Sequence, residues 1–224
     1  MSDQGSFPER RDDQFGLIET LLWTQGEGYY LLTEHLMRLA ASSAALGFSC
    51  NVDAAEAALA KAVAAQTHPH LRVRLVLSQD GAIDTGVTAI EPVPPTTIWR
   101  VALAQKRFHP DDPMLRHKTT RRALYEDELA QAVERHHADE VLFLNERDEI
   151  CEGARVNVFV PRGDRLITPP LSCGLLPGTL RARLIAEGRA CEATLSLNDL
   201  PPQFYLGNSV RGLVRATMIA WRQA

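Results

Sequence analysis

The stretch from residue 140 to residue 181, EVLFLNERDEICEGARVNVFVPRGDRLITPPLSCGLLPGTLR, decides the fold of this chain. Two short apolar runs, Val141–Leu144 and Val156–Val160, lie on either side of a charged turn, which is typical of paired buried strands. A second turn leads to a third strand at Leu166–Thr168, and two prolines follow that strand. The sequence Leu-Pro-Gly-Thr-Leu-Arg at 176–181 then predicts the start of a helix.

Two features of this stretch indicate a ligand. Glu152, next to Gly153, places a carboxylate at a strand edge, where it suits a cationic ring nitrogen. The glycine-opened start of the helix, Gly178–Leu180, offers backbone N–H groups that suit a phosphate. Pyridoxal 5′-phosphate (PLP) has both chemical groups. The residues therefore predict PLP as the cofactor, with Glu152 keeping the ring nitrogen protonated and the amides of Thr179 and Leu180 contacting the phosphate.

The same stretch resembles the EGxxxN, TPP and LPGxxR motifs of the class IV aminotransferases, which have PLP fold type IV. The resemblance extends from about Phe15 to about Ala216, and Asn157, which completes the first motif, is expected to secure a turn. The family includes branched-chain and D-amino-acid aminotransferases and aminodeoxychorismate lyase. The resemblance implies an α/β (α+β) fold of the D-amino-acid-aminotransferase type. In that fold, two domains with mixed sheets and flanking helices hold the cofactor between them.

The size and composition of the chain argue against several other classes of protein. Its 224 residues allow one large or two small domains, and a hydrophobic share of 45% is ordinary for a globular protein. The net charge is only −4 and no basic stripe occurs, so no nucleic-acid partner is expected. No apolar run approaches the ~20 residues that span a bilayer, and the polar start of the chain is no signal peptide, so no membrane partner is expected. The four cysteines lack metal-ligand spacing, which favours free thiols in a reducing, cytoplasmic compartment.

We expect two domains joined by a short linker. Residues 1–14 are predicted to form a disordered tail, residues 15–105 a small N-terminal α/β domain, residues 106–114 a polar linker, and residues 115–224 the C-terminal PLP-binding domain. In the first domain, the strands Phe15–Trp23 and Tyr29–Leu32 predict a hairpin. Thr33 is the expected N-cap of a helix that ends at Gly47. The apolar strand Ile98–Ala104 is expected to close this domain.

The first strand departs from the family pattern. Family members usually carry a glycine-rich GDGxFE motif at this place. Here Ile18, Glu19 and Thr20 match the end of the motif, and the glycines are absent. This departure leaves open a protein with the PLP fold that binds a ligand without catalysing a reaction.

His35 and Arg38 lie three positions apart on the predicted helix and therefore share one side of it. On spacing alone, this side is expected to be a solvated polar face. The HxxRL pattern resembles the family's helix whose arginine binds the PLP phosphate, and a guanidinium suits phosphate better than an ammonium does. The resemblance thus implies that Arg38 binds the phosphate. By the same resemblance, the loop at 207–212 contributes Asn208 and Ser209 to that site.

Lys118 precedes a predicted helix at Ala123–His136, where composition alone favours a surface charge. The surrounding sequence, His-Lys-Thr-Thr-Arg-Arg, resembles the family segment whose lysine forms an imine with PLP. The resemblance implies that Lys118 is this lysine and the catalytic residue. Burial and a cationic neighbour would lower its pKa and let it act as a base near neutral pH. Tyr125 is expected to pack its own helix.

Three arginines are candidates for binding the carboxylate of a small-molecule amino substrate. Arg74 shares one face of the alternating strand Leu71–Leu77 with Arg72, where solvent exposure is the simplest expectation. Family members often carry an arginine on the equivalent strand, which makes Arg74 a candidate. Arg155 and Arg211 are the other two candidates, since a guanidinium binds a carboxylate through two parallel hydrogen bonds.

The resemblance leaves the reaction open between two chemistries that share abstraction of the Cα proton. The short chain and the segments SCGLLPGTLRARLI and GNSVRGL resemble the aminodeoxychorismate lyase modules found alone or fused behind aminodeoxychorismate synthase. A lyase would convert 4-amino-4-deoxychorismate to 4-aminobenzoate and pyruvate in the folate pathway. The alternative is an aminotransferase for D- or branched-chain amino acids. The resemblance also implies a C2 homodimer and makes the synthase a candidate partner.

Overall fold

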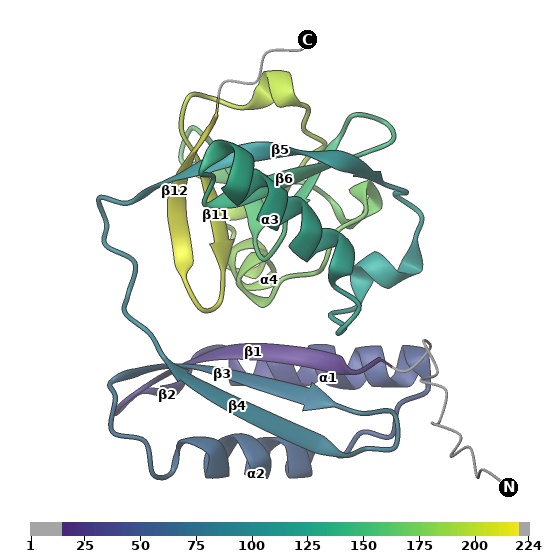
Figure 1. Cartoon of the computed structure of the whole chain (residues 1–224), viewed down its shortest axis with the longest axis vertical. Coiled ribbons are helices and arrows are strands. Elements are labelled where there is room, and N and C mark those ends of the chain that lie inside the picture. The colour runs from purple at the N-terminus through teal and green to yellow at the C-terminus, as the bar shows by residue number, and fades with distance from the viewer. Residues whose placement is uncertain (1–14, 220–224) are drawn as a thin grey trace, which may run out of the picture.

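The computed structural model describes residues 15–219, so the predicted tail at 1–14 lies outside the described residues. The strands form two sheets, one of four strands in the order β2-β1-β3-β4 and one of eight in the order β10-β9-β8-β11-β12-β5-β6-β7. Figure 1 shows the two sheets in separate units, one above the other, with helices packed on each. Two sheets with flanking helices confirm the predicted α+β class.

The smaller unit contains the strands β1 (Leu17–Thr24), β2 (Gly28–Tyr29), β3 (His70–Leu77) and β4 (Ile83–Ala89) and the helices α1 (Leu32–Leu46) and α2 (Val52–Val63). Strand β3 lies between β1 and β4 and pairs antiparallel with both. Its alternating apolar residues, such as Val73, are buried in a core with Leu39 of α1 and Leu59 of α2. Because side chains alternate along a strand, Arg72 and Arg74 project from the opposite face of the sheet.

Two local predictions in the smaller unit are wrong. Thr33 is not the N-cap, because α1 begins one residue earlier and Leu31 holds the N-cap position with a left-handed φ of 56° and no side-chain hydrogen bond. The predicted return strand at Tyr29–Leu32 is replaced by the two-residue β2, since the chain turns at once into the helix. The predicted helix end is confirmed: Gly47 has a φ of 71°, and its N–H donates to the carbonyl of Ser43.

The larger unit contains the remaining strands and helices. The strands are β5 (Ile98–Phe108), β6 (Glu140–Asn145), β7 (Ile150–Gly153), β8 (Asn157–Arg162), β9 (Arg165–Thr168), β10 (Ala190–Glu192), β11 (Phe204–Asn208) and β12 (Gly212–Met218), and the helices are α3 (Ala123–His136) and α4 (Thr179–Ala186). Strand β5 pairs parallel with β6 and β12, whereas β6 with β7 and β8 with β9 pair antiparallel, so the sheet is mixed as predicted. The three strands predicted within 140–181 correspond to β6, β8 and β9, and every residue of β6 is buried.

The chain crosses from one unit to the other earlier than predicted. The strand expected to close the first domain, Ile98–Ala104, is part of β5, which pairs within the larger sheet. The predicted linker at 106–114 begins inside β5 and runs into a short 3-10 turn at Pro113–Arg116. The proline-rich segment at 90–97 makes the crossing instead. Apolar alternation identifies a strand, but it does not say which sheet the strand joins.

The segment before α3 ties the two units together through β1. The N–H of Ile18 donates to the carbonyl of Lys118 at 2.8 Å, and the N–H of Thr120 donates to the carbonyl of Gly16 at 2.9 Å. A side chain at Gly16 would not fit, since a Cβ there would lie 2.8 Å from Val76 Cγ1. These bonds hold Lys118 at the boundary between the units.

Two further expectations concern the cysteines and the membrane. All four cysteines are free thiols as predicted, and Cys151 and Cys173 are buried. Burial raises the pKa of both buried thiols, so neither is a thiolate near neutral pH. Among residues 15–219, no helix is long and apolar enough to cross a membrane.

Candidate active site

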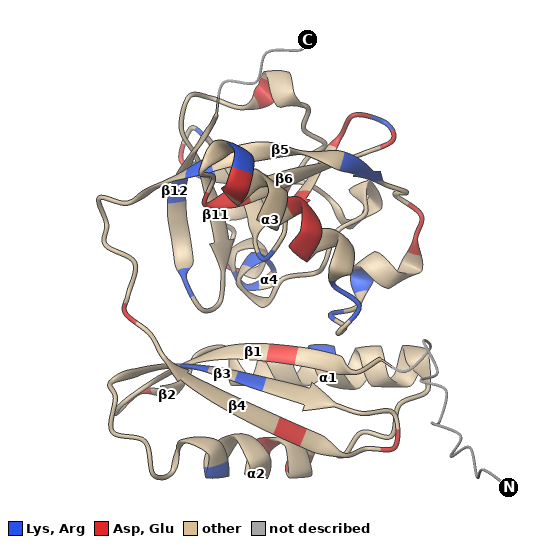
Figure 2. Ribbon diagram, in the orientation of Figure 1, with Lys and Arg blue, Asp and Glu red and all other residues tan. Residues whose placement is uncertain are grey.

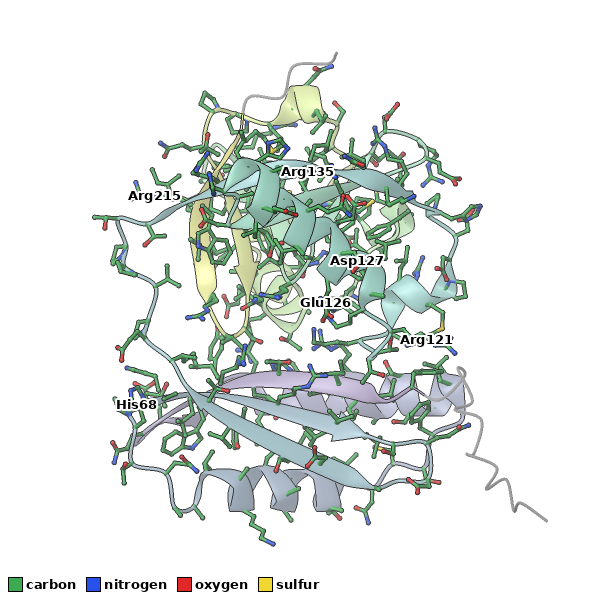
Figure 3. The ribbon with its side chains drawn as sticks, viewed as in Figure 1. His68, Arg121, Glu126, Asp127, Arg135 and Arg215 are labelled. Atoms are coloured by element: carbon green, nitrogen blue, oxygen red, sulfur yellow. The ribbon has the colours of Figure 1, made fainter. Side chains whose placement is uncertain are left out.

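A cavity of about 800 Å³ lies between the two units and is lined by residues of both. Figure 2 shows basic residues on both sides of this boundary, and Figure 3 shows Arg121 on the larger unit close to it. Nine of the ten site residues predicted from the sequence line the cavity: Lys118, Glu152, Arg38, Thr179, Asn208, Ser209, Arg74, Arg155 and Arg211. Leu180 is the exception, because its side chain packs with Phe159 and Leu184 in the core of the larger unit. Only the backbone of Leu180 is therefore left for the predicted phosphate contact.

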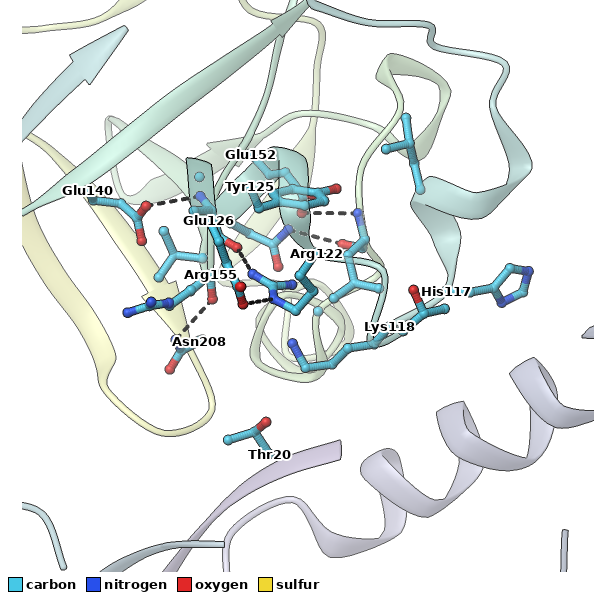
Figure 4. Close-up of a pocket in the computed structure, with 18 of the residues that line it drawn as sticks. Thr20, His117, Lys118, Arg122, Tyr125, Glu126, Glu140, Glu152, Arg155 and Asn208 are labelled. Atoms are coloured by element: carbon cyan, nitrogen blue, oxygen red, sulfur yellow. Dashed lines mark hydrogen bonds and ion pairs between the residues drawn. The ribbon is translucent and has the colours of Figure 1, made fainter. Parts of the chain in front are cut away.

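Lys118 extends into the cavity between Arg122 and Thr20, as Figure 4 shows. Burial, together with the nearby guanidinium groups of Arg38 and Arg122, lowers the pKa of its ammonium to about 7, and Glu19 and Glu152 oppose this only in part. An amine with a pKa near 7 is available as a neutral nucleophile and base at physiological pH. This environment agrees with the role that the resemblance implied for Lys118.

Glu152 lies at the end of β7 with only 4% of its surface exposed. Its Oε1 accepts a hydrogen bond from the Tyr125 hydroxyl at 3.0 Å, and its Oε2 accepts one from the Leu176 N–H at 3.1 Å. Burial raises the pKa of the carboxyl to about 7, which these two bonds only partly oppose. The next residue must be glycine, since a Cβ at Gly153 would lie 2.7 Å from Val156 Cγ2.

The loop before α4 is held by Asn157. The side-chain amide of Asn157 donates to the carbonyl of Leu176 at 3.0 Å, as expected for a residue that secures a turn. Gly178 packs directly on this amide, and a Cβ there would lie only 1.9 Å from Asn157 Oδ1. The EGxxxN and LPGxxR motifs therefore fit together physically. The close approach explains why a glycine stands immediately before the first helical residue, Thr179.

Arg38 is oriented by a buried carboxylate. Its Nε and Nη2 donate to the two oxygens of Glu19 at 2.9 and 2.6 Å, and its Nη1 donates to the carbonyl of Pro177 at 3.1 Å. Glu19 comes from β1 and Pro177 from the loop before α4, so Arg38 contacts both units. The solvated face expected from helix spacing alone is wrong, and the position of Arg38 agrees with the family pattern.

His35 is buried with 1% of its surface exposed, although spacing alone indicated a surface residue. Its Nδ1 lies 2.5 Å from Glu19 Oε2. Its Nε2 lies 2.9 Å from Ser209 Oγ and 3.2 Å from Thr179 Oγ1. One imidazole thus connects the smaller unit with the hydroxyls of two residues of the larger unit, Ser209 and Thr179, that were predicted to contact phosphate, Thr179 through its backbone amide.

The candidate substrate arginines differ in their surroundings. Arg74 lines the cavity from β3, and burial together with the charges of Arg122 and Arg72 lowers its pKa. Arg155 lines the cavity from the turn between β7 and β8. Arg211 also lines the cavity, but its Nη1 donates to the carbonyl of Glu91 in the segment that crosses between the units. Arg74 and Arg155 are therefore better placed to meet a substrate carboxylate.

Asn208 organises the loop between β11 and β12. Its Oδ1 accepts hydrogen bonds from the N–H groups of Val210 and Arg211, and its Nδ2 donates to the carbonyl of Arg155. These bonds hold the turn that presents the Ser209 hydroxyl to the cavity. Asn208 itself also lines the cavity beside Ser209.

Sequence reasoning missed three residues of the site. Glu19 was noted only as part of the first-strand motif, yet it orients both His35 and Arg38. His35 was expected at the surface. Tyr125 was expected only to pack its helix; its ring does contact Phe108 and Phe143, but its hydroxyl also donates to Glu152. The HxxRL pattern was the available signal for His35, whereas the contact of Tyr125 required the fold.

Comparison with known proteins identifies the family. Residues 16–219 match the family described as amino-transferase class IV. The chain belongs to this family. Its members are PLP-dependent enzymes, aminotransferases or aminodeoxychorismate lyases among them, so the chain is an enzyme of this PLP-dependent type. The structural matches also confirm the predicted fold.

Three similar proteins are informative. A protein from Schizosaccharomyces pombe named "Putative aminodeoxychorismate lyase" is 30% identical over 92% of this chain and 91% of its own length. The crystal structure of a "Putative amino-acid aminotransferase" from Mesorhizobium loti is 41% identical, with a TM-score of 0.86 over 92% of this chain and 100% of that chain. A hypothetical aminotransferase from Mycobacterium tuberculosis in PLP-bound form is 21% identical, with a TM-score of 0.78 over 96% of this chain and 87% of that chain, and shows the shared fold.

The residues of the cavity fit PLP. Glu152 is a buried carboxyl whose high pKa shows that its cationic neighbours are too few or too distant to hold it ionised. A protonated ring nitrogen would supply that missing partner. Elsewhere in the lining, Arg38 supplies a guanidinium, Thr179 a hydroxyl at the start of α4, and Ser209 a hydroxyl from the loop between β11 and β12, a combination that suits a phosphate. Lys118 lines the same cavity with a pKa that favours imine formation.

Proposed function

We propose that this enzyme is a PLP-dependent lyase that converts 4-amino-4-deoxychorismate to 4-aminobenzoate and pyruvate. The observation that carries the proposal is a pair of arginines, Arg72 and Arg74, that line the cavity side by side from β3. The proposed substrate has two carboxylates, one on its ring and one on its enolpyruvyl group. Two adjacent guanidinium groups suit such a dianion better than a substrate with a single carboxylate.

The charge of the cavity supports a dianionic substrate. Its lining includes eight arginines and Lys118, against five acidic residues. The arginines are Arg38, Arg72, Arg74, Arg107, Arg121, Arg122, Arg155 and Arg211, and the acidic residues are Asp112, Glu126, Asp139, Glu140 and Glu152. An excess of positive charge in a cavity with low-dielectric walls raises the local concentration of anions. Burial and then the charges of Arg122 and Arg72 lower the pKa of Arg74, and a bound carboxylate would oppose these effects.

The proposed roles fall on three parts of the cavity lining. Arg38, Thr179 and Ser209 would hold the cofactor phosphate, and Glu152 would face the ring nitrogen. When bound, PLP supplies an electron sink for the charge left on the substrate. Lys118 would hold the cofactor covalently and then, once displaced by the substrate amine, take the Cα proton on its Nζ. Its pKa near 7 allows this proton to be taken and returned at neutral pH.

An aminotransferase for D- or branched-chain amino acids is the second candidate. The similarity to the Mesorhizobium loti aminotransferase structure, at 41% identity, favours it. The same Lys118 and Glu152 would serve, because removal of the Cα proton is the first chemical step in both reactions. The two candidates differ in what leaves: an enolpyruvyl group in the lyase, or an amino group that passes to a second keto acid.

A paired assay tests the two candidates. The purified protein is loaded with PLP and incubated with 4-amino-4-deoxychorismate, and 4-aminobenzoate and pyruvate are measured. In parallel, it is incubated with D- and branched-chain amino acids in the presence and absence of a second keto acid. Formation of 4-aminobenzoate and pyruvate in equal amounts supports the lyase. Keto-acid release that requires the second keto acid, without 4-aminobenzoate, would replace the lyase with the aminotransferase. The variant Lys118→Ala is the control in both assays.

We also propose that the enzyme acts as a cytoplasmic C2 homodimer, as the resemblance to its family implied. Light scattering of the purified protein tests this proposal, and a monomer that retains full activity would overturn it. Aminodeoxychorismate synthase remains the candidate partner because it produces the proposed substrate. Co-purification of the two proteins tests that pairing.

A further inference from the structure

His35 lies between the two units in a chain of hydrogen bonds that no predicted role explains. On one side, its Nδ1 is 2.5 Å from Glu19 Oε2 in the smaller unit. On the other side, its Nε2 is 2.9 Å from Ser209 Oγ and 3.2 Å from Thr179 Oγ1 in the larger unit. His35, Glu19 and both hydroxyl residues are buried. Thr179 and Ser209 also line the cavity, so the hydrogen bonds that His35 makes with these hydroxyls affect how they can bond to a ligand there.

The proton on one side of the ring is determined by Glu19. Burial by itself opposes ionisation of this carboxyl, but Arg38 and His35 outweigh that effect and lower its pKa to about 2. An ionised carboxylate can only accept hydrogen bonds, so His35 Nδ1 must carry a proton and donate it. Nε2 is then the atom whose protonation can vary. The donor and acceptor roles of Ser209 and Thr179 depend on it.

Two arrangements of the hydroxyl protons follow. If Nε2 is unprotonated, it accepts a hydrogen bond from the closer hydroxyl, that of Ser209, which then has no proton left to donate to a ligand. If Nε2 is protonated, it donates to the hydroxyl oxygens, and Ser209 and Thr179 can turn their protons toward the cavity. A fully ionised phosphate has no proton to donate, so it can only accept hydrogen bonds. Only the second arrangement therefore offers it both hydroxyls as donors.

The charges around His35 determine which arrangement holds. Glu19 on β1 and Arg38 on α1 cancel each other, so a proton on Nε2 leaves an extra positive charge in a buried site. Glu34 of α1 favours that charge, and the facing loop and α4 contribute the neutral Ser209 and Thr179. A phosphate dianion at these hydroxyls would supply the missing negative charge. We propose that His35 takes up a proton when a phosphate dianion binds, and thereby makes Ser209 and Thr179 donors to it.

His35 is thus a positioning residue, which acts on the ligand through two hydroxyls. The test uses the full-length cofactor-free protein and pyridoxine 5′-phosphate, whose alcohol replaces the aldehyde and cannot react with Lys118. Titration calorimetry in buffers of different ionisation enthalpy counts the protons taken up on binding. We expect the wild-type protein to take up more protons on binding than His35→Gln above about pH 7, where the phosphate is already a dianion. The wild-type dissociation constant should rise up to about tenfold per pH unit more steeply than that of the variant.

His35→Gln is the matched variant because its amide N–H can reach toward Ser209 as a permanent donor without titrating. Any proton exchanged by Glu152 occurs in both proteins and cancels in the comparison. Equal proton uptake by the two proteins would overturn the proposal. If the variant does not fold, the ¹⁵N shifts of the His35 ring in the wild-type protein decide instead: Nε2 must become protonated when the ligand binds. Neither measurement involves turnover, so a negative result here leaves the choice between lyase and aminotransferase untouched.

Discussion

The site contains two buried glutamates that behave in opposite ways: Glu19 is bonded to Arg38 and His35 in the smaller unit, and Glu152 is part of the cavity lining. Glu19 is 3% exposed and has a pKa lowered to about 2, whereas Glu152 is 4% exposed and has a pKa raised to about 7. Burial raises the pKa of both. Glu19 is ion-paired with Arg38 at 2.6 Å, while Glu152 accepts hydrogen bonds from a neutral hydroxyl and a backbone N–H. Two equally buried carboxyls thus differ in charge because only Glu19 has partners that outweigh the effect of burial.

This difference matches the two chemical groups that PLP would bring. The ionised Glu19 holds Arg38 and His35 beside the hydroxyls of Thr179 and Ser209, and this group suits a phosphate. The Glu152 carboxyl, whose pKa is about 7, changes its charge near neutral pH and suits a ring nitrogen that must be kept protonated. Lys118 lies in the same cavity and is influenced by both carboxylates.

The largest effect is expected for Lys118→Ala, which removes the amine shared by both candidate reactions. Turnover should fall by ~10³-fold or more, because both the covalent attachment and the proton transfer are lost. The absorption band of the protein-bound imine should disappear in the ultraviolet-visible spectrum. Arg121→Ala, three residues after Lys118, is not suited as a control because Arg121 lines the same cavity. Arg135→Ala, at an exposed position of α3, is the control and should keep both the band and the activity. If Lys118→Ala also kept both, Lys118 would not be the lysine that binds PLP.

The two glutamates should respond differently to the same substitution. In cofactor-free protein, Glu19→Gln should lower the free energy of unfolding by roughly 3–5 kcal/mol, because Arg38 and His35 lose a buried anionic partner. Glu152→Gln should instead raise it at neutral pH, because the amide does not ionise and so avoids the cost of keeping a buried carboxyl whose pKa burial raises to about 7. With PLP bound, Glu152→Gln should instead slow turnover by ~10²-fold. Urea unfolding and steady-state assays measure the two effects. Equal losses of stability in Glu19→Gln and Glu152→Gln would mean that the two glutamates do not differ in charge.

The pH dependence of stability should carry the signature of Glu152 and Lys118. Between pH 4.5 and about 7, the unfolded chain has released the Glu152 proton while the folded protein keeps it, so stability falls as pH rises. Between about 7 and pH 10.5, the unfolded chain holds the Lys118 proton that the folded protein lacks, so stability rises with pH. Each slope approaches about 1.4 kcal/mol per pH unit.

Urea unfolding of the cofactor-free protein from pH 5 to 9 measures these slopes. Glu152→Gln should remove the fall on the acid side, and Lys118→Met should remove the rise on the alkaline side. Glu19 should contribute only at lower pH, where its stabilisation is lost as pH falls from 4.5 to about 2. Unchanged slopes in both variants would show that other groups titrate over this range.

The smallest effect is expected for Tyr125→Phe. This substitution removes the hydroxyl that donates to Glu152 Oε1 at 3.0 Å and keeps the ring against Phe108 and Phe143. We expect a loss of about 1 kcal/mol in stability and a further rise in the pKa of Glu152. The acid-side slope of the stability profile should therefore extend to higher pH. A profile that matches the wild-type one would show that the hydroxyl does not influence the carboxyl.

The parts of the site that lie in short motifs could be predicted from the sequence. Glu152 with Gly153, and Gly178 with its helix, were identified because a carboxylate and a glycine have restricted uses at such places. The structure adds the reasons, namely close packing against Val156 and Asn157. Lys118 and Arg38 required the family resemblance as well, since a lone lysine or arginine in a sequence is most often a surface charge.

The rest depended on contacts between distant residues. His35 and Ser209 are 174 positions apart, and Tyr125 and Glu152 are 27 apart, so no local pattern reports their hydrogen bonds. The strand at 98–104 was predicted correctly but assigned to the wrong domain, because its alternation is the same in either sheet. Leu31 at the start of α1 was missed because a leucine in the left-handed region has no sequence signal.

The sequence by itself determined the strands and helices, the glycines at close approaches and the residue types needed for PLP chemistry, because apolar periodicity and backbone freedom are local properties. Only the tertiary structure decided which sheet each strand joins and how Glu19 and Glu152 are charged. Those outcomes depend on which groups meet across the boundary between the two units. Burial and electrostatic partners depend on all neighbours in space, and most of these neighbours are distant in the sequence.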